Sequence, residues 1–293
     1  MRDNDRIIQG MAGEGDFRIL AVQTTTAVET AREILDLSPV AADALGRAMT
    51  GALLLARLLD KDLRNQYVTL RFEGDGPLGL VIADGTAAGG VRGYVANPVP
   101  EAGAGDVPEA LGAGKLTVIR GTPPAGKPYT SQLLLGGGGI AQDLTRYLMR
   151  SEQIASAVLL GVLNRRDGVA AAGGLVVQAF PHATTDSIAR MEAAIQQAPP
   201  LSSLLAKHEI EDVVAEVLGP VGFKQIDSGS TVPVSYRCTC SHERALAPLA
   251  LFPREELEQM AREGGTEVAC QFCGRKYQIS ASELLALTAK HEA

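Results

Sequence analysis

The sequence predicts an α+β protein in three parts: an N-terminal mixed α/β core domain, a helical linker and a small C-terminal domain. Apolar residues recur at helical spacing over 24–62, and Gly-punctuated runs rich in Val, Ile and Leu follow over 66–134. All four cysteines fall within the last 56 of the 293 residues. We therefore expect a core domain over 1–183, a linker over 184–232 and a cysteine-bearing domain over 233–293.

Two helices are expected at the start of the core domain. The first covers 24–37, and the second covers 38–62, with Ser38 at the N-cap and Pro39 at the first helical position, where a missing N–H has no cost. The second helix carries an apolar stripe dominated by small side chains, which predicts close packing. Its members are Ala41, Ala44, Leu45, Ala48, Ala52 and Leu55.

Strands follow these helices. Three are expected over 66–98, then a long surface loop over 97–114, then a strand pair within 115–135. Helical spacing returns over 139–153, and 156–180 is typical of a hairpin with "RRDG" at its turn.

The linker is predicted to be two helices broken at Pro199-Pro200. Its charged residues lie opposite an apolar face, so the segment can pack against another surface but is too thin to form a core. The apolar positions are Ile188, Met191, Ile195, Leu204, Leu205, Val213, Val214 and Leu218.

Composition restricts the class of protein. A formal net charge of -7 argues against a general nucleic-acid binder, which needs an electropositive face. The chain opens without an apolar secretory signal, and its longest apolar runs are too short to span a bilayer, so we expect a cytoplasmic protein. In a reducing compartment, paired cysteines indicate metal or redox chemistry more often than a structural disulfide.

The four cysteines form a C-x-C pair, Cys238 and Cys240, and a C-x-x-C pair, Cys270 and Cys273, separated by 29 residues. Two local pairs of thiolates match a closed tetrahedral zinc site, and we expect one Zn²⁺ per chain. The alternatives are four unrelated buried thiols or a static disulfide framework. A C-x-C disulfide would close a small ring, and strained disulfides are the reducible, regulatory kind.

Several other motifs carry little functional weight. The segment "GTPPAGKP" (121–128) has phosphate-loop spacing, but Pro128 replaces the Ser or Thr that would hold magnesium, so a hairpin loop is the better interpretation. The "GGGG" at 136–139 is expected to be a turn before a helix. His182, His208, His242 and His291 are scattered, and only His242 lies beside the cysteines. No catalytic set can be assembled, so we expect no enzyme.

The segment 238–280 closely resembles the C-terminal redox-switch module of the redox-regulated heat-shock chaperone family, the 33 kDa chaperonins. The shared pattern is C-x-C-S-x-E-R, an interval near thirty residues, then E-V-x-C-x-F-C-x-x-x-Y. Segments of the core domain, among them "VRGYVANP" and "AAGGLVVQ", also look like the family's. "GGI" and "SEQIASAV" depart from the commoner "GEI" and "SEQTPSAV", away from the cysteines.

The resemblance implies a stress-activated holdase that binds unfolding client proteins. Reduced protein would hold zinc through Cys238, Cys240, Cys270 and Cys273, and oxidation would form the disulfides Cys238–Cys240 and Cys270–Cys273 and expel the metal. The C-terminal domain and linker would then unfold, the oxidised chain would dimerise, and ATP-dependent chaperones would refold the released clients.

Two rival functions come from other classes. A static zinc ribbon that binds nucleic acid is disfavoured because 233–293 holds seven Lys/Arg against eight Asp/Glu, a net charge of -1. A thiol-disulfide oxidoreductase built on Cys270-Gln-Phe-Cys273 lacks the βαβ context that such a motif needs.

Overall fold

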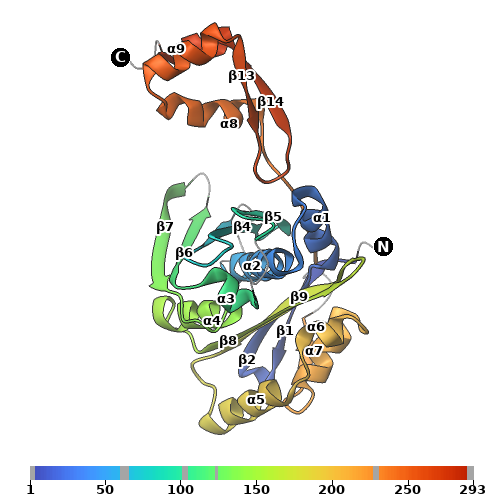
Figure 1. Cartoon of the computed structure of the whole chain (residues 1–293). Helices are drawn as coiled ribbons and strands as arrows, with labels where there is room; N and C mark the ends of the chain where they lie inside the picture. The colour runs from blue at the N-terminus through green and yellow to red at the C-terminus, as the bar shows by residue number, and fades with distance from the viewer. Residues whose placement is uncertain (1–3, 60–65, 101–104, 123–124, 227–230, 289–293) are drawn as a thin grey trace. The chain divides into compact units, whose positions relative to one another are not determined.

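The computed structural model describes residues 4–59, 66–100, 105–122, 125–226 and 231–288, and it divides the chain into two compact units, 1–237 and 238–293. The expected α+β class is confirmed (Figure 1). The three-part division into core, linker and C-terminal domain stays a prediction. No helix in the described ranges combines the length and the apolar character needed to cross a membrane.

The first unit contains two six-stranded sheets. In the first sheet the order is β10-β1-β2-β9-β8, with β11 also paired to β1, and every pairing is antiparallel. The expected hairpin over 156–180 is confirmed, with Arg166 and Asp167 at its turn. The strands are β1 (Arg6–Ala12), β2 (Phe17–Gln23), β8 (Ser156–Arg165), β9 (Gly168–Ala179), β10 (Phe223–Gln225) and β11 (Val232–Pro233), with a short 3₁₀ helix η1 (Gly13–Gly15) between β1 and β2.

The strands β1 and β2 were not expected from the sequence. They lie in the middle of the sheet, and Ile8, Ile19 and Leu20 are fully buried there. In β2 four consecutive residues, Ile19 to Val22, are buried rather than alternating between buried and exposed. A strand buried on both faces loses the period-two pattern that identifies strands.

The second sheet has the order β12-β5-β4-β3-β6-β7. The predicted strands over 66–98 and 115–135 are confirmed, and they form antiparallel neighbours. At one edge a two-residue strand, β12, pairs in parallel with β5. The strands are β3 (Tyr67–Gly74), β4 (Leu80–Thr86), β5 (Gly90–Val95), β6 (Gly114–Thr122), β7 (Ala125–Leu134) and β12 (Ser235–Tyr236).

A single helix, α2 (Pro39–Leu58), packs against strands of both sheets and forms the centre of the first unit (Figure 1). The predicted start is confirmed, since Ser38 caps the helix and its Oγ accepts a bond from the Ala41 N–H at 3.4 Å. The predicted extension over 60–62 lies outside the described residues. The stripe of small side chains on α2 lets the backbones of α2 and β4 approach closely. A Cβ at Gly85 of β4 would lie 2.5 Å from the carbonyl carbon of Ala52.

Gly85→Ala should destabilise the first unit by about 1–3 kcal/mol, because the added methyl meets the helix backbone, which cannot move aside as a side chain can. Thermal unfolding followed by circular dichroism would measure the loss. Gly219→Ala is the matched control, since Gly219 has ordinary right-handed helical backbone angles and its nearest atom is a carbonyl oxygen at 3.0 Å. Equal melting temperatures for the two variants would contradict the close approach.

The remaining helices of the core region are α1 (Thr25–Leu35), α3 (Val107–Leu111) and α4 (Ile140–Ser151). The expectation of a loop throughout 97–114 is wrong at α3, where the Asp106 side chain accepts a bond from the Glu109 N–H at 3.1 Å and starts a short helix. Residues 101–104 of that loop lie outside the described part. The turn predicted at 136–139 is confirmed, and Gly139 with φ of 87° begins α4.

The segment predicted as a linker contains three helices: α5 (Thr185–Gln197), α6 (Leu201–Leu205) and α7 (Ile210–Leu218). The break at Pro199-Pro200 is confirmed, but the second predicted helix is interrupted again between Leu205 and Ile210. The apolar face of these three helices packs on the first sheet. Met191, Val213, Val214 and Leu218 are buried against Ile8, Ile19 and Leu175 of that sheet, and Ile188 and Ile195 are partly buried.

Charged contacts also hold α7 to the first sheet. The guanidinium of Arg6 on β1 pairs with Glu209 at 3.1 Å and with Glu211, and Asn4 donates to Glu209 at 2.5 Å. The Arg6 side chain is 17% exposed and its two partners are 47% and 35% exposed, and ion pairs open to solvent on one side typically contribute about 1 kcal/mol or less. The apolar face therefore supplies most of the attachment, and the charges fix its register.

The second unit is small. It consists of α8 (His242–Leu246), the 3₁₀ helix η2 (Ala247–Leu251), α9 (Arg254–Arg262), the hairpin β13 (Gly265–Ala269) and β14 (Lys276–Ser280), and α10 (Ala281–Thr288). Its buried apolar cluster contains Leu249, Leu257, Ala261, Ile279, Leu284 and Leu287. A core of this size is thin for more than fifty residues.

Candidate metal centre

The four cysteines lie on two loops of the second unit. Cys238 and Cys240 precede α8, whose N-cap is Ser241, and Cys270 and Cys273 lie in the turn that joins β13 to β14. The hairpin pairs Ala269 with Lys276, so the turn that holds the second pair is fixed at its base. The fold thus presents one loop to the other.

Backbone bonds shape the turn between β13 and β14. The Cys270 N–H donates to the Arg275 carbonyl at 2.9 Å, and the N–H groups of Cys273 and Gly274 both donate to the Cys270 carbonyl, at 3.3 and 2.8 Å. Gly274 has φ of 68°, a left-handed conformation that suits glycine. This geometry turns both cysteine side chains of the C-x-x-C pair to the same side.

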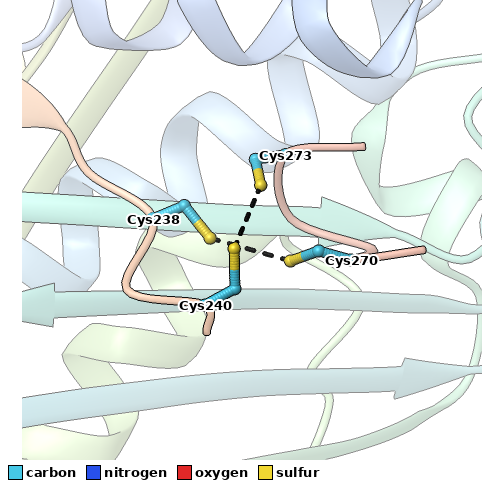
Figure 2. A group of neighbouring side chains, drawn as sticks. All are labelled: Cys238, Cys240, Cys270 and Cys273. Carbon is cyan, nitrogen blue, oxygen red and sulfur yellow. Dashed lines mark hydrogen bonds between the residues drawn. The ribbon is translucent and has the colours of Figure 1, made fainter. Parts of the chain in front are cut away.

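The four sulfur atoms converge (Figure 2). The Sγ atoms of Cys238 and Cys270 are 3.7 Å apart, those of Cys240 and Cys273 are 3.5 Å apart, and all four lie within 4.8 Å of one another. A regular tetrahedron with Zn–S bonds of about 2.3 Å has sulfur–sulfur edges of about 3.8 Å. A disulfide needs about 2.05 Å, and the four thiols are free. The donor set therefore fits a four-coordinate zinc ion.

The environments of the thiols differ. The Tyr277 hydroxyl donates to the Cys240 sulfur at 3.0 Å, and this bond, with weaker bonds from the other sulfurs, lowers the pKa of Cys240 to about 7. Burial raises the pKa of Cys273 to about 12 and raises that of Cys270. Four thiolates this close together would repel one another, and a metal cation would supply the positive charge that balances them.

Basic side chains near the cysteines have separate roles. Arg244 donates to the carbonyl and hydroxyl oxygens of Thr239, at 2.8 and 2.6 Å, and so supports the C-x-C loop. Lys276 pairs with Glu267 at 2.8 Å on the hairpin. The pKa of Arg275 is raised, first by a hydrogen bond with Tyr277 and then by the charges of Cys240 and Cys273.

His242 is not part of the sulfur cluster. Its Nε2 lies 2.6 Å from the Glu283 carboxylate, and its ring meets that of Tyr277 edge-on at 6.1 Å. Glu283 also accepts bonds from the hydroxyl and N–H of Ser280, which, with His242, lower its pKa to about 2. The pair joins the start of α8 to the start of α10.

The other motifs named from the sequence do not join this site. The segment 121–128 forms the β6–β7 hairpin, with Thr122 paired to Ala125, and Pro123 and Pro124 lie outside the described residues. His182 and His208 lie beside Asp16 and Glu216, at 3.7 and 4.0 Å. His291 lies outside the described part.

Comparison with known proteins identifies the family of this chain and agrees with the fold. The family model described as Hsp33 protein matches residues 5–280. The chain belongs to the Hsp33 family. A 33 kDa chaperonin of Thermus thermophilus is 46% identical, over 97% of this chain and 87% of that protein. A 33 kDa chaperonin of Deinococcus radiodurans is 37% identical, over 96% of this chain and 97% of that protein.

A solved structure also matches this Hsp33-family chain along its length. The crystal structure of a 33 kDa chaperonin (heat shock protein 33 homolog) from Thermotoga maritima has a TM-score of 0.85 and 35% identity, covering 99% of each chain. The named relatives are chaperonins rather than enzymes, which agrees with the absence of a catalytic set in the sequence.

Sequence reasoning gave Tyr277 and Glu283 no role. Tyr277 lies four residues after Cys273, within the motif itself, and that spacing across a hairpin turn was the available signal. Glu283 had no such signal, because its contact with His242 joins residues 41 apart in the chain.

Tyr277→Phe should weaken zinc retention about tenfold to a hundredfold, because a hydrogen bond that orients a metal ligand is lost. Competition between the reduced full-length protein and a chromogenic chelator would measure the change. Tyr129→Phe is the matched control, since that ring is exposed on β7. Equal retention in the two variants would show that the Tyr277 hydroxyl does not support the site.

Proposed function

We propose that this chain is a redox-regulated holdase that binds unfolding proteins under oxidative stress in the cytoplasm. In the reduced state Cys238, Cys240, Cys270 and Cys273 bind one Zn²⁺, and the chain is inactive. The observation that carries the proposal is the convergence of four free thiols within 4.8 Å in a unit with a very small apolar core. Membership in a family whose relatives are named chaperonins supports client binding.

Oxidation replaces the metal by two disulfides, Cys238–Cys240 and Cys270–Cys273. Two molecules of hydrogen peroxide accept the four electrons of the four thiolates and, with four protons, become four molecules of water. The sulfur atoms of a disulfide carry no negative charge to hold Zn²⁺, because the thiolate is the metal ligand, so the metal leaves. The chain itself catalyses no reaction.

The metal and the disulfides constrain the fold differently. A zinc ion would join the C-x-C loop to the β13–β14 turn. Sulfur atoms already approach between the loops, Cys238 and Cys270 at 3.7 Å and Cys240 and Cys273 at 3.5 Å. Each proposed disulfide closes a ring within one loop and leaves the two loops unlinked. Zinc–thiolate binding contributes roughly 10–16 kcal/mol in small peptides, so its loss unfolds a unit with so few buried side chains.

Unfolding then extends to the helices α5, α6 and α7. These helices hide apolar residues of the first sheet, and their own apolar side chains are buried by that contact and by one another. Release exposes both surfaces to clients and to a second oxidised chain, which gives the dimer. The bound clients pass to ATP-dependent chaperones for refolding.

The two rival functions find less support. The C-x-x-C pair lies in a turn between antiparallel strands, not at the start of a helix as in a thiol-disulfide oxidoreductase. The net charge of -1 over 233–293 provides no excess of positive charge to attract the phosphates of a nucleic acid.

Reduced protein should carry one zinc per chain, and peroxide should release it while client aggregation becomes suppressed. Elemental analysis, disulfide mapping and an aggregation assay would follow the three changes on one sample. In the oxidised sample limited proteolysis should cut first within 184–293 and leave 1–183, because the metal no longer supports the C-terminal part. Cys240→Ser should lose zinc, whereas His242→Ala, the control, should keep it.

Unchanged zinc content or an unchanged protease pattern after peroxide would refute the switch. If zinc leaves but aggregation suppression does not increase, the proposed metal site stands and its regulatory role is refuted.

Met191→Glu combined with Val214→Glu should give chaperone activity without an oxidant, because two buried charges undock α5 and α7 from the first sheet. The control combines Ala193→Glu with Ala215→Glu, which adds the same charges at exposed positions of the same helices. Proteolysis reports undocking, and the aggregation assay reports activity. A variant that undocks yet still needs peroxide would place the client surface elsewhere.

A further inference from the structure

The first unit contains a recess, distant in sequence from the cysteines, that the proposed function does not use. It lies between the end of α2, the middle of α4 and strands β2, β6 and β9, and its volume is about 130 Å³. An apolar cavity of about 150 Å³ accommodates a benzene ring. The lining residues are Arg18, Leu55, Leu58, Leu59, Arg120, Tyr147, Leu148, Glu152, Ile154 and Gln178.

The recess has an apolar wall and a polar wall. Leucines from α2 and α4 form the apolar wall together with Ile154, an isoleucine that is 38% exposed. The polar wall holds Arg18 and Arg120, with Gln178 nearly buried beside them. A ligand that fits both walls has one apolar group and one polar head.

Charge in the recess is unbalanced. Glu152 is fully engaged, because it pairs with Arg120 at 2.8 Å and accepts a bond from the Tyr147 hydroxyl at 2.7 Å. Arg18 forms no ion pair with a carboxylate in the described ranges. The lining residues alone therefore carry one uncompensated positive charge.

The contacts of Arg18 are weak for a half-buried cation. Its two terminal nitrogens donate to the carbonyls of Leu58 and Arg57, both at 3.3 Å, at the C-terminal end of α2. The C-terminal end of a helix carries about half a negative charge, which offsets part of the Arg18 charge, whereas the neighbouring Arg57 adds a full positive charge. Burial, with the charge of Arg57, lowers the pKa of Arg18. Within the described part of the chain the Nε atoms of Arg57 and Arg120 are buried without hydrogen-bond partners.

We propose that this recess binds an organic carboxylate with a single apolar group about the size of a phenyl ring or a leucine side chain. The carboxylate lies against the guanidinium of Arg18, and the apolar group lies against Leu148 and Ile154. Two sources carry this chemistry: a free small carboxylic acid, and the C-terminal residue of a peptide. The proposal is independent of the metal site and of the redox switch.

The probe for the first source is 3-phenylpropanoate, and its uncharged match is 3-phenylpropanol. Titration into full-length protein with labelled Ile and Leu methyl groups should shift the NMR signals of Ile154 and Leu148, with a dissociation constant on the order of 1 mM for a ligand of this size. The alcohol should bind at least about tenfold more weakly, since it cannot form a charge-assisted bond. No shift, or equal shifts for both probes, would overturn the proposal.

Two variants test the assigned walls. Arg18→Gln removes the charge but keeps donors for the α2 carbonyls, and it should weaken 3-phenylpropanoate binding about tenfold. Arg166→Gln, in the exposed β8–β9 turn, removes a charge far from the recess and should change nothing. Ile154→Trp should fill the mouth and abolish binding, which keeps the proposal testable if Arg18→Gln does not fold. Unchanged binding in either folded variant would refute the site.

Peptide probes separate the two sources. N-acetyl-Ala-Phe with a free carboxylate and the same peptide with a C-terminal amide are titrated in parallel. If the free carboxylate shifts Ile154 and the amide does not, the recess accepts chain ends as well as small acids. If neither peptide binds while 3-phenylpropanoate does, the ligand is a free acid. Binding of the amide as tightly as the acid would contradict a carboxylate site.

Discussion

The second unit of this protein depends on the mutual approach of four sulfur atoms. Two loops that are 29 residues apart in sequence bring their thiols together. Two local features position these thiols: Ser241 starts α8 directly after the C-x-C pair, and Gly274 turns the chain back after the C-x-x-C pair. The buried apolar cluster of the unit has only six members among the described residues, so few other interactions hold it together.

The first unit is stabilised in a different way. The helix α2 is almost entirely buried between strands of both sheets, and its alanines allow the backbones of α2 and β4 to approach. Helices α5 to α7 are attached less extensively than α2, because one apolar face and a few partly exposed ion pairs hold them to the first sheet. The chain therefore combines one unit with a large buried core and a second unit whose buried core is small.

Much of this arrangement could be predicted from the sequence because it is locally encoded. The cap at Ser38, the hairpin turn at Arg166-Asp167 and the pairing of cysteines by short spacing each depend on a few adjacent residues. The strand β2 was missed because a strand buried on both faces lacks alternation. Contacts such as Glu283 with His242 depend on how α10 meets α8, and no local pattern encodes that meeting.

The strand β12 has a consequence for the edge of the second sheet. It covers β5 with only two residues, through bonds such as that from the Arg237 N–H to the Val91 carbonyl at 2.8 Å. Cys238 lies two residues after Tyr236, where the strand ends. A strand this short cannot remain paired once the chain beyond it loses its order and begins to move. Its departure would leave unpaired backbone groups along β5, where an extended segment of another polypeptide can add as a new strand. Under the proposed redox switch, the state of four sulfur atoms determines whether Gly90 and Val91 at this sheet edge are paired.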